Sequence, residues 1–374
     1  MQRLRILFSL LFSGFFFTGY SQFTVTGMVL DSGSREPLAA ASIFCQNTTL
    51  GTYTNKQGEF SIALKSGGYD LIISYTGYQT KTIRVSDNIK LEVLMTKEDK
   101  SLSEVVIKTS NEVSNGWEKY GDFFIKNFIG STSNATRTII QNPEALKFFY
   151  YKRSNKLKVL ATDAILIANN AMGYNIRYQL DSFVYYYNTD VSLYRGYCFF
   201  SQMEGSDSLK YVWQKTRSLT YYGSKLHFMH SYYDSTIIED GWIIDMLDDT
   251  DKKKFNKIPD VYDTAFYNIA VNERDSIGAD SITYKVPFGP AEVEIYFPAK
   301  ISITYKNARP EKEYLKKMNL PKTAPYQISY IDMKNWITIS ENGYYYDQKN
   351  WVNQGYWSWK NLADQLPYDY NPPD

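Results

Sequence analysis

The chain has 374 residues, which is long enough for two or three domains that each bury a core. Lys and Arg total 41 against 40 Asp and Glu, so the nearly balanced charge gives no electrostatic footprint for nucleic acid or an anionic membrane surface. Tyr, Phe and Trp number 34, 21 and 7; this excess of aromatic residues favours half-buried sheet surfaces, although it also permits stacking on sugar rings.

Residues 1–21 have the order of a secretory signal peptide. Arg3 and Arg5 precede an apolar run at 6–18, and the small residues Gly19 and Ser21 suit cleavage before residue 22. As a helix, the apolar run would span about 20 Å, which is less than the roughly 30 Å of a bilayer core. The sequence therefore predicts an exported protein whose mature chain has no transmembrane helix.

Residues 22–107 read as short alternating strands with turn signals between them, which is the spacing of a β-sandwich. Asn55 to Gly58 is the clearest turn, because Gly58 can adopt a positive φ there. The predicted strands are residues 23–30, 41–45, 60–64, 69–75, 79–85 and 91–95.

A series of ordered motifs runs through this first unit. They are Gly27-x-Val29 with Asp31, Pro37-Leu38, Ala41-x-Ile43, Gly51-Thr52-x-Thr54-Asn55-x-x-Gly58-x-Phe60, and Ser74-Tyr75-x-Gly77-Tyr78. Together they resemble the carboxypeptidase regulatory-like domain of exported proteins from Gram-negative bacteria. The resemblance implies a seven-stranded, transthyretin-like β-sandwich with a carbohydrate-binding-like fold and no catalytic residues. It gives no reason to expect a peptidase.

In many relatives this domain precedes a TonB-dependent receptor, and residues 102–107 resemble the segment that joins the two. The residues after 107 are too few for the plug and large barrel of such a receptor. A complete transporter is therefore not expected. The shared domain nevertheless implies a cell-envelope location, either in the periplasm or at the outer membrane.

A linker at 108–114 leads into a second, uncharacterised domain at 115–374. Trp117, Tyr120, Phe124 and Phe128 form one apolar stripe, which predicts a helix at 115–128. Further predicted helices are 208–232 and 359–366, and predicted strands are 146–151, 157–163, 165–168, 175–187, 191–200, 281–286, 291–297, 300–306, 327–332 and 336–340. The strands between 146 and 200 suggest a meander.

The fold class is thus mainly β with some α: the N-terminal seven-stranded β-sandwich plus a larger, antiparallel β-rich α+β domain. Asn142-Pro143, the segment 171–178 and the segment 217–230 are similar, in that order, to uncharacterised exported bacterial proteins that carry the same first domain. This second similarity implies no activity.

Few residues point to catalysis or metal binding. His227 and His230 are the only histidines, and with Asp234 a turn further on they could bind Zn²⁺, although ordinary packing explains them better. The acidic run at 245–251 lacks the glycine of a calcium loop and is followed by lysines. Cys45 and Cys198 are expected to be two separate buried thiols rather than a disulfide. No cofactor is predicted.

The aromatic C-terminal region is the one predicted ligand site. It comprises Tyr344, Tyr345, Tyr346, Trp351, Tyr356, Trp357 and Trp359. Exposed rings of this kind can stack on sugars, whereas buried rings would pack the C-terminal segment onto the sheet, which is the commoner arrangement.

Two functional hypotheses follow from these patterns. The first is an exported, non-enzymatic envelope protein with a docking or binding role, whose partner is an envelope protein or a glycan. The alternative is a glycan or peptide hydrolase that uses carboxylates or the His227 and His230 pair.

Overall fold

The computed structural model describes residues 22–98, 111–247, 292–346 and 348–373. The predicted leader at 1–21, the segment 102–107, part of the predicted linker at 108–114, most of the acidic run and the predicted strand 281–286 lie outside the described residues. None of the helices in the described ranges is long and apolar enough to cross a membrane.

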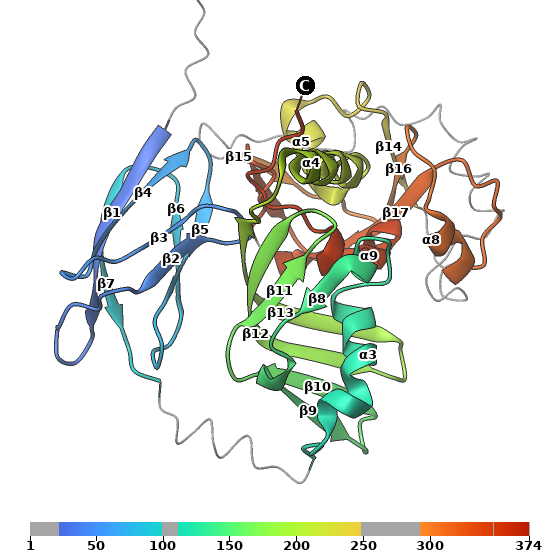
Figure 1. Ribbon diagram of the computed structural model, residues 1–374. Coiled ribbons are helices and arrows are strands. Elements are labelled where there is room, and N and C mark those ends of the chain that lie inside the picture. Colours follow the sequence, from blue (N-terminus) through green and yellow to red (C-terminus); the bar gives the residue numbers. More distant parts are fainter. Residues whose placement is uncertain (1–21, 99–110, 248–291, 347, 374) are drawn as a thin grey trace, which may run out of the picture.

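The N-terminal unit is a sandwich of two sheets, drawn in blue in Figure 1. One sheet has the order β4 (Glu59–Lys65), β1 (Gln22–Asp31) and β7 (Ile89–Met95), and the other has the order β3 (Gly51–Tyr53), β2 (Ser42–Cys45), β5 (Tyr69–Ser74) and β6 (Lys81–Val85). Alternate side chains of β1 and β4 are buried, as the sequence pattern requires. The predicted seven-stranded sandwich is confirmed; only the short strand β3 was not predicted.

The second unit begins with helix α3 (Gly116–Phe128) on one face of a six-stranded sheet. The strands are β8 (Thr138–Ile140), β9 (Leu146–Tyr151), β10 (Lys156–Ala161), β11 (Ile165–Asn169), β12 (Tyr174–Tyr186) and β13 (Val191–Gln202). Short 3₁₀ turns at Ala135–Arg137 and Pro143–Ala145 lead into β8 and β9. Phe124 and Phe128 meet Phe183 and Tyr178 edge to face in the core between the helix and the sheet.

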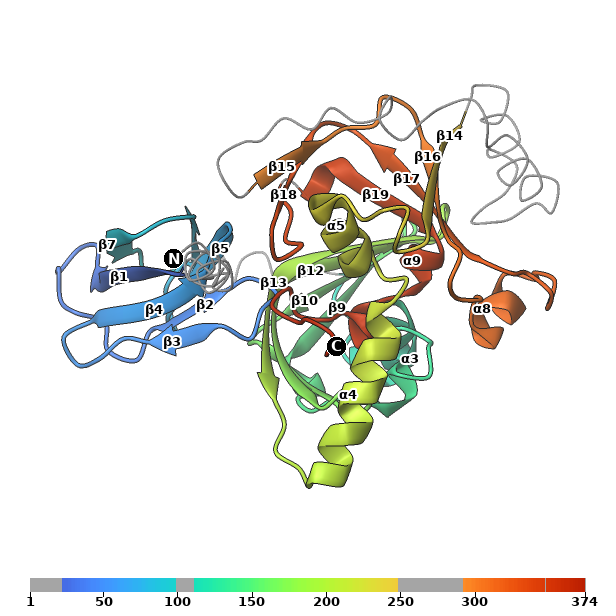
Figure 2. The same ribbon diagram turned by 90° about the horizontal axis from the view of Figure 1, so that it is seen from above.

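This sheet is antiparallel, but it is not the predicted meander. β12 is 13 residues long, and both β11 and β10 pair with successive parts of one of its edges. β13 pairs along the other edge, so β12 lies at the centre of the sheet. The sheet lies between the sandwich and α3 in both Figure 1 and Figure 2.

The remaining chain forms a second core beside the first. A four-stranded sheet has the order β14 (Trp242–Met246), β16 (Ile301–Tyr305), β17 (Gln327–Met333) and β19 (Trp351–Gly355), and β15 (Glu292–Ile295) pairs with β18 (Ile337–Ser340). The helices are α4 (Asp207–Tyr221), α5 (Lys225–Asp234), α8 (Lys312–Lys317) and α9 (Tyr356–Trp359), with 3₁₀ turns at Gln348–Asn350 and Leu362–Asp364. The mostly β, part-helical fold class is confirmed.

The predicted helix 208–232 is wrong as one element, because the chain breaks between α4 and α5. Gly223 has φ of 83°, and a Cβ there would lie 2.8 Å from the ring of Tyr305. Ser224 then caps α5 by accepting a hydrogen bond from the backbone N–H of His227. The break changes the direction of the chain, so that the apolar stripes of the two helices need not face the same core.

The predicted helix 359–366 is also wrong. α9 ends at Trp359, and the chain after it forms only the short 3₁₀ turn Leu362–Asp364, in which Ala363 bonds to distant segments. The backbone N–H of Ala363 donates to Ile129, and its carbonyl accepts from the side chain of Asn169. These bonds hold the C-terminal tail, residues 360–373, along the first core.

Candidate functional site

The loop of the sandwich between β2 and β3 is inserted into the second unit. The N–H of Asn47 donates to the carbonyl of Cys198 at 2.8 Å, and the N–H of Phe200 donates to the carbonyl of Thr48 at 3.0 Å. From the other side, the N–H of Tyr368 in the tail donates to the carbonyl of Asn47 at 2.8 Å. The loop therefore lies as a turn between β13 and the tail, with Asn47 in the left-handed region (φ of 56°), and its backbone bonds to both sides.

A second set of contacts joins β5 and β6 to the turn after β18. The hydroxyl of Tyr344 donates to the Asp70 carboxylate at 2.6 Å, and Arg84 binds the same carboxylate at 3.3 Å. The Arg84 guanidinium also lies 3.5 Å from the ring centroid of Tyr346. We call these contacts, together with those of the inserted loop, the seam.

The structure places all seven predicted ligand-binding aromatics in the interior. Tyr344 and Tyr346 are in the seam, and the other five belong to the second core: Tyr345, Trp351, Tyr356, Trp357 and Trp359. Their exposed fractions lie between 2% and 6%. The indole N–H of Trp357 donates to the carbonyl of Gly223, and that of Trp359 donates to Ser131. In this arrangement the rings lie against protein atoms, so sugar stacking by them stays a prediction.

Both histidines lie on α5 and are buried. His227 accepts a hydrogen bond at Nδ1 from the N–H of Gly223 at 3.2 Å, and Nδ1 of His230 lies 2.7 Å from the hydroxyl of Tyr221. Within the described ranges, no group of three His, Cys, Asp or Glu side chains is arranged to hold a metal ion. The structure therefore does not bring Asp234 together with the two histidines into such a group.

Burial lowers the pKa of His227 to about 4, although the charge of Asp240 acts in the opposite direction. The unfolded chain, with a histidine pKa near 6.5, takes up the proton first, so stability is full above about pH 6.5 and falls as the pH drops towards 4. Relative to neutral pH, we expect the titration of His227 to lower the free energy of unfolding by about 2 kcal/mol at pH 5.

His227→Asn keeps an acceptor for Gly223 and removes this titration. Urea unfolding at pH 7.5 and pH 5 should therefore show a smaller loss of stability in the variant than in the parent. Because His230 remains, part of the loss should persist, since burial lowers its pKa as well. Equal losses in the two proteins would contradict the assignment.

A buried carboxylate in the tail forms hydrogen bonds with the loop before β8. Asp364 accepts hydrogen bonds from Thr132 at 2.7 Å and from Asn134 at 2.9 Å, and Lys360 lies 3.5 Å away. Lys360 also contacts Glu311. Burial raises the pKa of Asp364, while Lys360 and the two hydrogen bonds act in the opposite direction. With these partners the group is a structural anchor.

Cys45 and Cys198 are both free and buried, which confirms the prediction of two separate thiols. Each has a phenylalanine beside it, and the rings of Phe44 and Phe199 meet across the seam at 5.4 Å.

An exposed apolar face on α4 was not predicted. Tyr211, Val212, Leu219 and Tyr222 are 69%, 44%, 71% and 47% exposed. Tyr211, Val212 and Leu219 fall on one side of α4, with the exposed Lys215 between them and the buried Trp213 opposite, and Tyr222 directly follows the last residue of the helix. Figure 2 shows α4 at the outside of the molecule, close to the C-terminus. In the predicted single helix 208–232, Val212 and Leu219 belong to one apolar set with Leu226 and Met229. The Gly223-Ser224 pair was the signal against it.

Known proteins match parts of this chain. A family model described as a CarboxypepD_reg-like domain matches residues 25–107, so the predicted regulatory-like domain is confirmed. The TonB-dependent receptor SusC of Bacteroides thetaiotaomicron is 33% identical over 86 residues, which is 23% of this chain and 8% of the receptor. The TonB-dependent receptor P39 of Formosa agariphila is 30% identical over 105 residues, 28% of this chain and 10% of that receptor.

Similarity to solved structures is low. A DUF3823 family protein from Bacteroides ovatus has 12% identity and a TM-score of 0.16, covering 50% of this chain and 83% of that one. A type II cohesin–X-dockerin complex from Acetivibrio cellulolyticus has 24% identity and a TM-score of 0.18, covering 21% of this chain and 59% of that one. No function is inferred from either structure.

Proposed function

Starting from the CarboxypepD_reg-like domain at residues 25–107, we propose that this chain is a non-enzymatic binding protein of the bacterial cell envelope. The sandwich is fixed on the second unit, and the apolar face of α4 contacts a partner protein. Two observations support the envelope location: the leader pattern at 1–21, and the similarity of the first unit to parts of two TonB-dependent receptors.

The apolar face of α4 carries the proposal. Single exposed apolar residues are common, but three on one side of a helix, with Tyr222 directly after it, form an apolar patch around Lys215 of a kind found at interfaces. Leu219 and Val212 offer no hydrogen bonds to sugar hydroxyls, whereas tyrosines with aliphatic neighbours are frequent where proteins meet. A protein partner therefore fits this surface better than a glycan.

The seam supports a positioning role for the sandwich. Its loop is paired on both sides, and the Asp70, Arg84 and Tyr344 contacts fix the orientation of β5 and β6 against the second unit. The sandwich then acts as a rigid spacer rather than as a freely moving domain. No specific observation favours the hydrolase alternative, which stays a prediction.

Photo-crosslinking in a bacterium that carries the gene tests the proposal. A photoreactive phenylalanine analogue replaces Tyr211 on α4, and in a matched control it replaces Leu166 on β11, which is 43% exposed. We expect the Tyr211 probe, but not the Leu166 probe, to form an adduct with an envelope protein.

Leu219→Glu should reduce the Tyr211 adduct by about tenfold, because it puts a charge into the contact. Leu166→Glu should leave the adduct unchanged. The proposal fails if the Tyr211 probe forms no adduct, or if both probes capture the same proteins equally. Binding of the purified chain to envelope polysaccharide, without an α4 adduct, would favour a glycan-binding role instead.

A further inference from the structure

The outer edge of β13 is only partly used by the seam. The C-terminal part of β13 pairs with the inserted loop: the carbonyl of Cys198 accepts a hydrogen bond from the N–H of Asn47, and the N–H of Phe200 donates to the carbonyl of Thr48. These groups point away from β12. Backbone groups alternate in direction along a strand, so those of Ser192 and Tyr194 also point away from β12. In the described part of the chain, no residue pairs with the outward groups of Ser192 and Tyr194.

The side chains along this open edge are unusual for an unprotected strand. Val191 and Leu193 are 42% and 58% exposed, and residues 191–194 contain no charge and no proline. Strand edges are normally blunted by lysine, proline or a bulge on the exposed strand. The bulge in this strand pair lies on β12, between Leu180 and Ser182. The backbone of β13 therefore stays regular from the seam to its N-terminal end at Val191.

We propose that two copies of this chain associate by antiparallel pairing of their β13 edges, centred on Leu193. Around that centre, Ser192 of each copy forms a hydrogen-bonded pair with Tyr194 of the other, which satisfies the open backbone groups on both sides. Leu193 lies opposite Leu193 of the second copy, and Val191 lies opposite Arg195. The exposed leucine becomes covered, and no like charges face each other.

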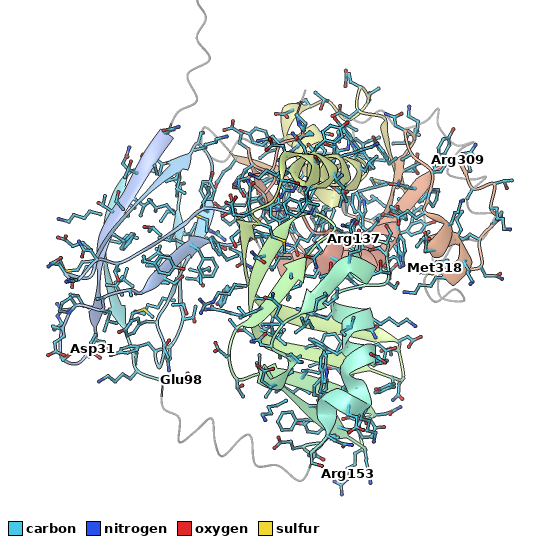
Figure 3. All side chains as sticks on the ribbon, viewed as in Figure 1. Asp31, Glu98, Arg137, Arg153, Arg309 and Met318 are labelled. Carbon is cyan, nitrogen blue, oxygen red and sulfur yellow. The ribbon has the colours of Figure 1, made fainter. Side chains whose placement is uncertain are left out.

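A second copy fits this edge better than an unrelated peptide for two reasons. When two copies of residues 191–195 pair antiparallel around Leu193, apolar side chains meet and no like charges face each other. Binding of an unrelated peptide would not explain this self-complementary sequence. The edge also continues an interface in which β13 already pairs with another segment, the inserted loop. Figure 1 shows the sandwich beside the upper part of β13, and Arg153 in Figure 3 marks the lower end of the sheet, away from the sandwich.

Cysteine crosslinking tests the register. The Cα atoms of a non-hydrogen-bonded pair lie about 4.5 Å apart, which a disulfide can join. Leu193→Cys should therefore give a disulfide-linked dimer under mild oxidation of the purified full-length chain. Val191→Cys is the matched control, because the two copies of residue 191 would lie about 13 Å apart. Cys45 and Cys198 are buried, so the parent should form no crosslink.

Light scattering measures association without the new cysteine. The parent should be a dimer, and Leu193→Lys should raise the dimer dissociation constant by about tenfold or more, because two lysines would then face each other. Leu166→Lys, on another strand, should leave it unchanged. A parent that stays monomeric at 100 µM and no Leu193→Cys dimer would overturn the proposal, and equal crosslinking at 191 and 193 would overturn the register. A monomer with a foreign peptide on this edge would identify the other occupant.

Discussion

Asp364→Ala is expected to lower the free energy of unfolding by about 2–4 kcal/mol, because it leaves two buried hydrogen-bond donors without this acceptor, at about 1–3 kcal/mol each. The substitution leaves the hydroxyl of Thr132 and the amide of Asn134 without their acceptor, and it leaves Lys360 with Glu311 alone. It also removes the side-chain bonds between the tail and the loop before β8, where the backbone bond from Ala363 to Ile129 remains. Urea unfolding at pH 7.5 measures the change.

Two matched variants separate the anchor from a general effect of losing a carboxylate. Asp332→Ala removes an exposed acid on β17, and its effect should stay within about 0.5 kcal/mol. Asp364→Asn keeps one acceptor oxygen, so it should fall between the parent and Asp364→Ala. If Asp364→Ala were as stable as Asp332→Ala, the anchor would have no role in stability.

Local patterns predicted most elements well. Residues 146–151 were predicted as a strand, and β9 has both ends as predicted, because a run of large apolar and aromatic residues is followed closely by the turn residues Ser154-Asn155. The break at Gly223 has a local signal, the Gly223-Ser224 pair, that the prediction did not use, and a distant cause, because Tyr305 and Gln327 approach the glycine from β16 and β17. β19 and α8 were missed for a similar reason, since tertiary packing determines such short segments.

In the candidate site, too, local sequence predicted which residues matter but not their distant contacts. Residue type alone identified Tyr344 to Tyr346 as important, but Asp70, the hydrogen-bond partner of Tyr344, lies 274 residues away in the sequence. Whether a tyrosine faces solvent or a seam depends on how two domains meet, which periodicity does not report. The exposed apolar face of α4 was not predicted, because apolar residues on one side of a helix are expected to be buried against a neighbouring element.

Gly68→Ala is expected to disturb the seam and to lower the free energy of unfolding by about 3 kcal/mol, at the upper end of the usual cost of overpacking. An added Cβ would overlap the hydroxyl of Tyr346 and would lie 2.8 Å from the Glu292 carboxylate. Tyr346 cannot easily move away, because it is 2% exposed and its ring carries the Arg84 guanidinium at 3.5 Å.

Hydrogen exchange locates the damage. The N–H groups of Asn47, Phe200 and Tyr368 form the bonds of the inserted loop, so they should exchange faster in Gly68→Ala if the whole seam loosens. Gly33→Ala is the matched control in the same sandwich, since its Cβ would meet only the Asp31 carboxylate at 3.3 Å. Because the cost comes from the Tyr346 ring, adding Tyr346→Ala should make the double variant more stable than the sum of the two single losses predicts. Strict additivity of the two substitutions would show that residue 68 acts on stability without the seam.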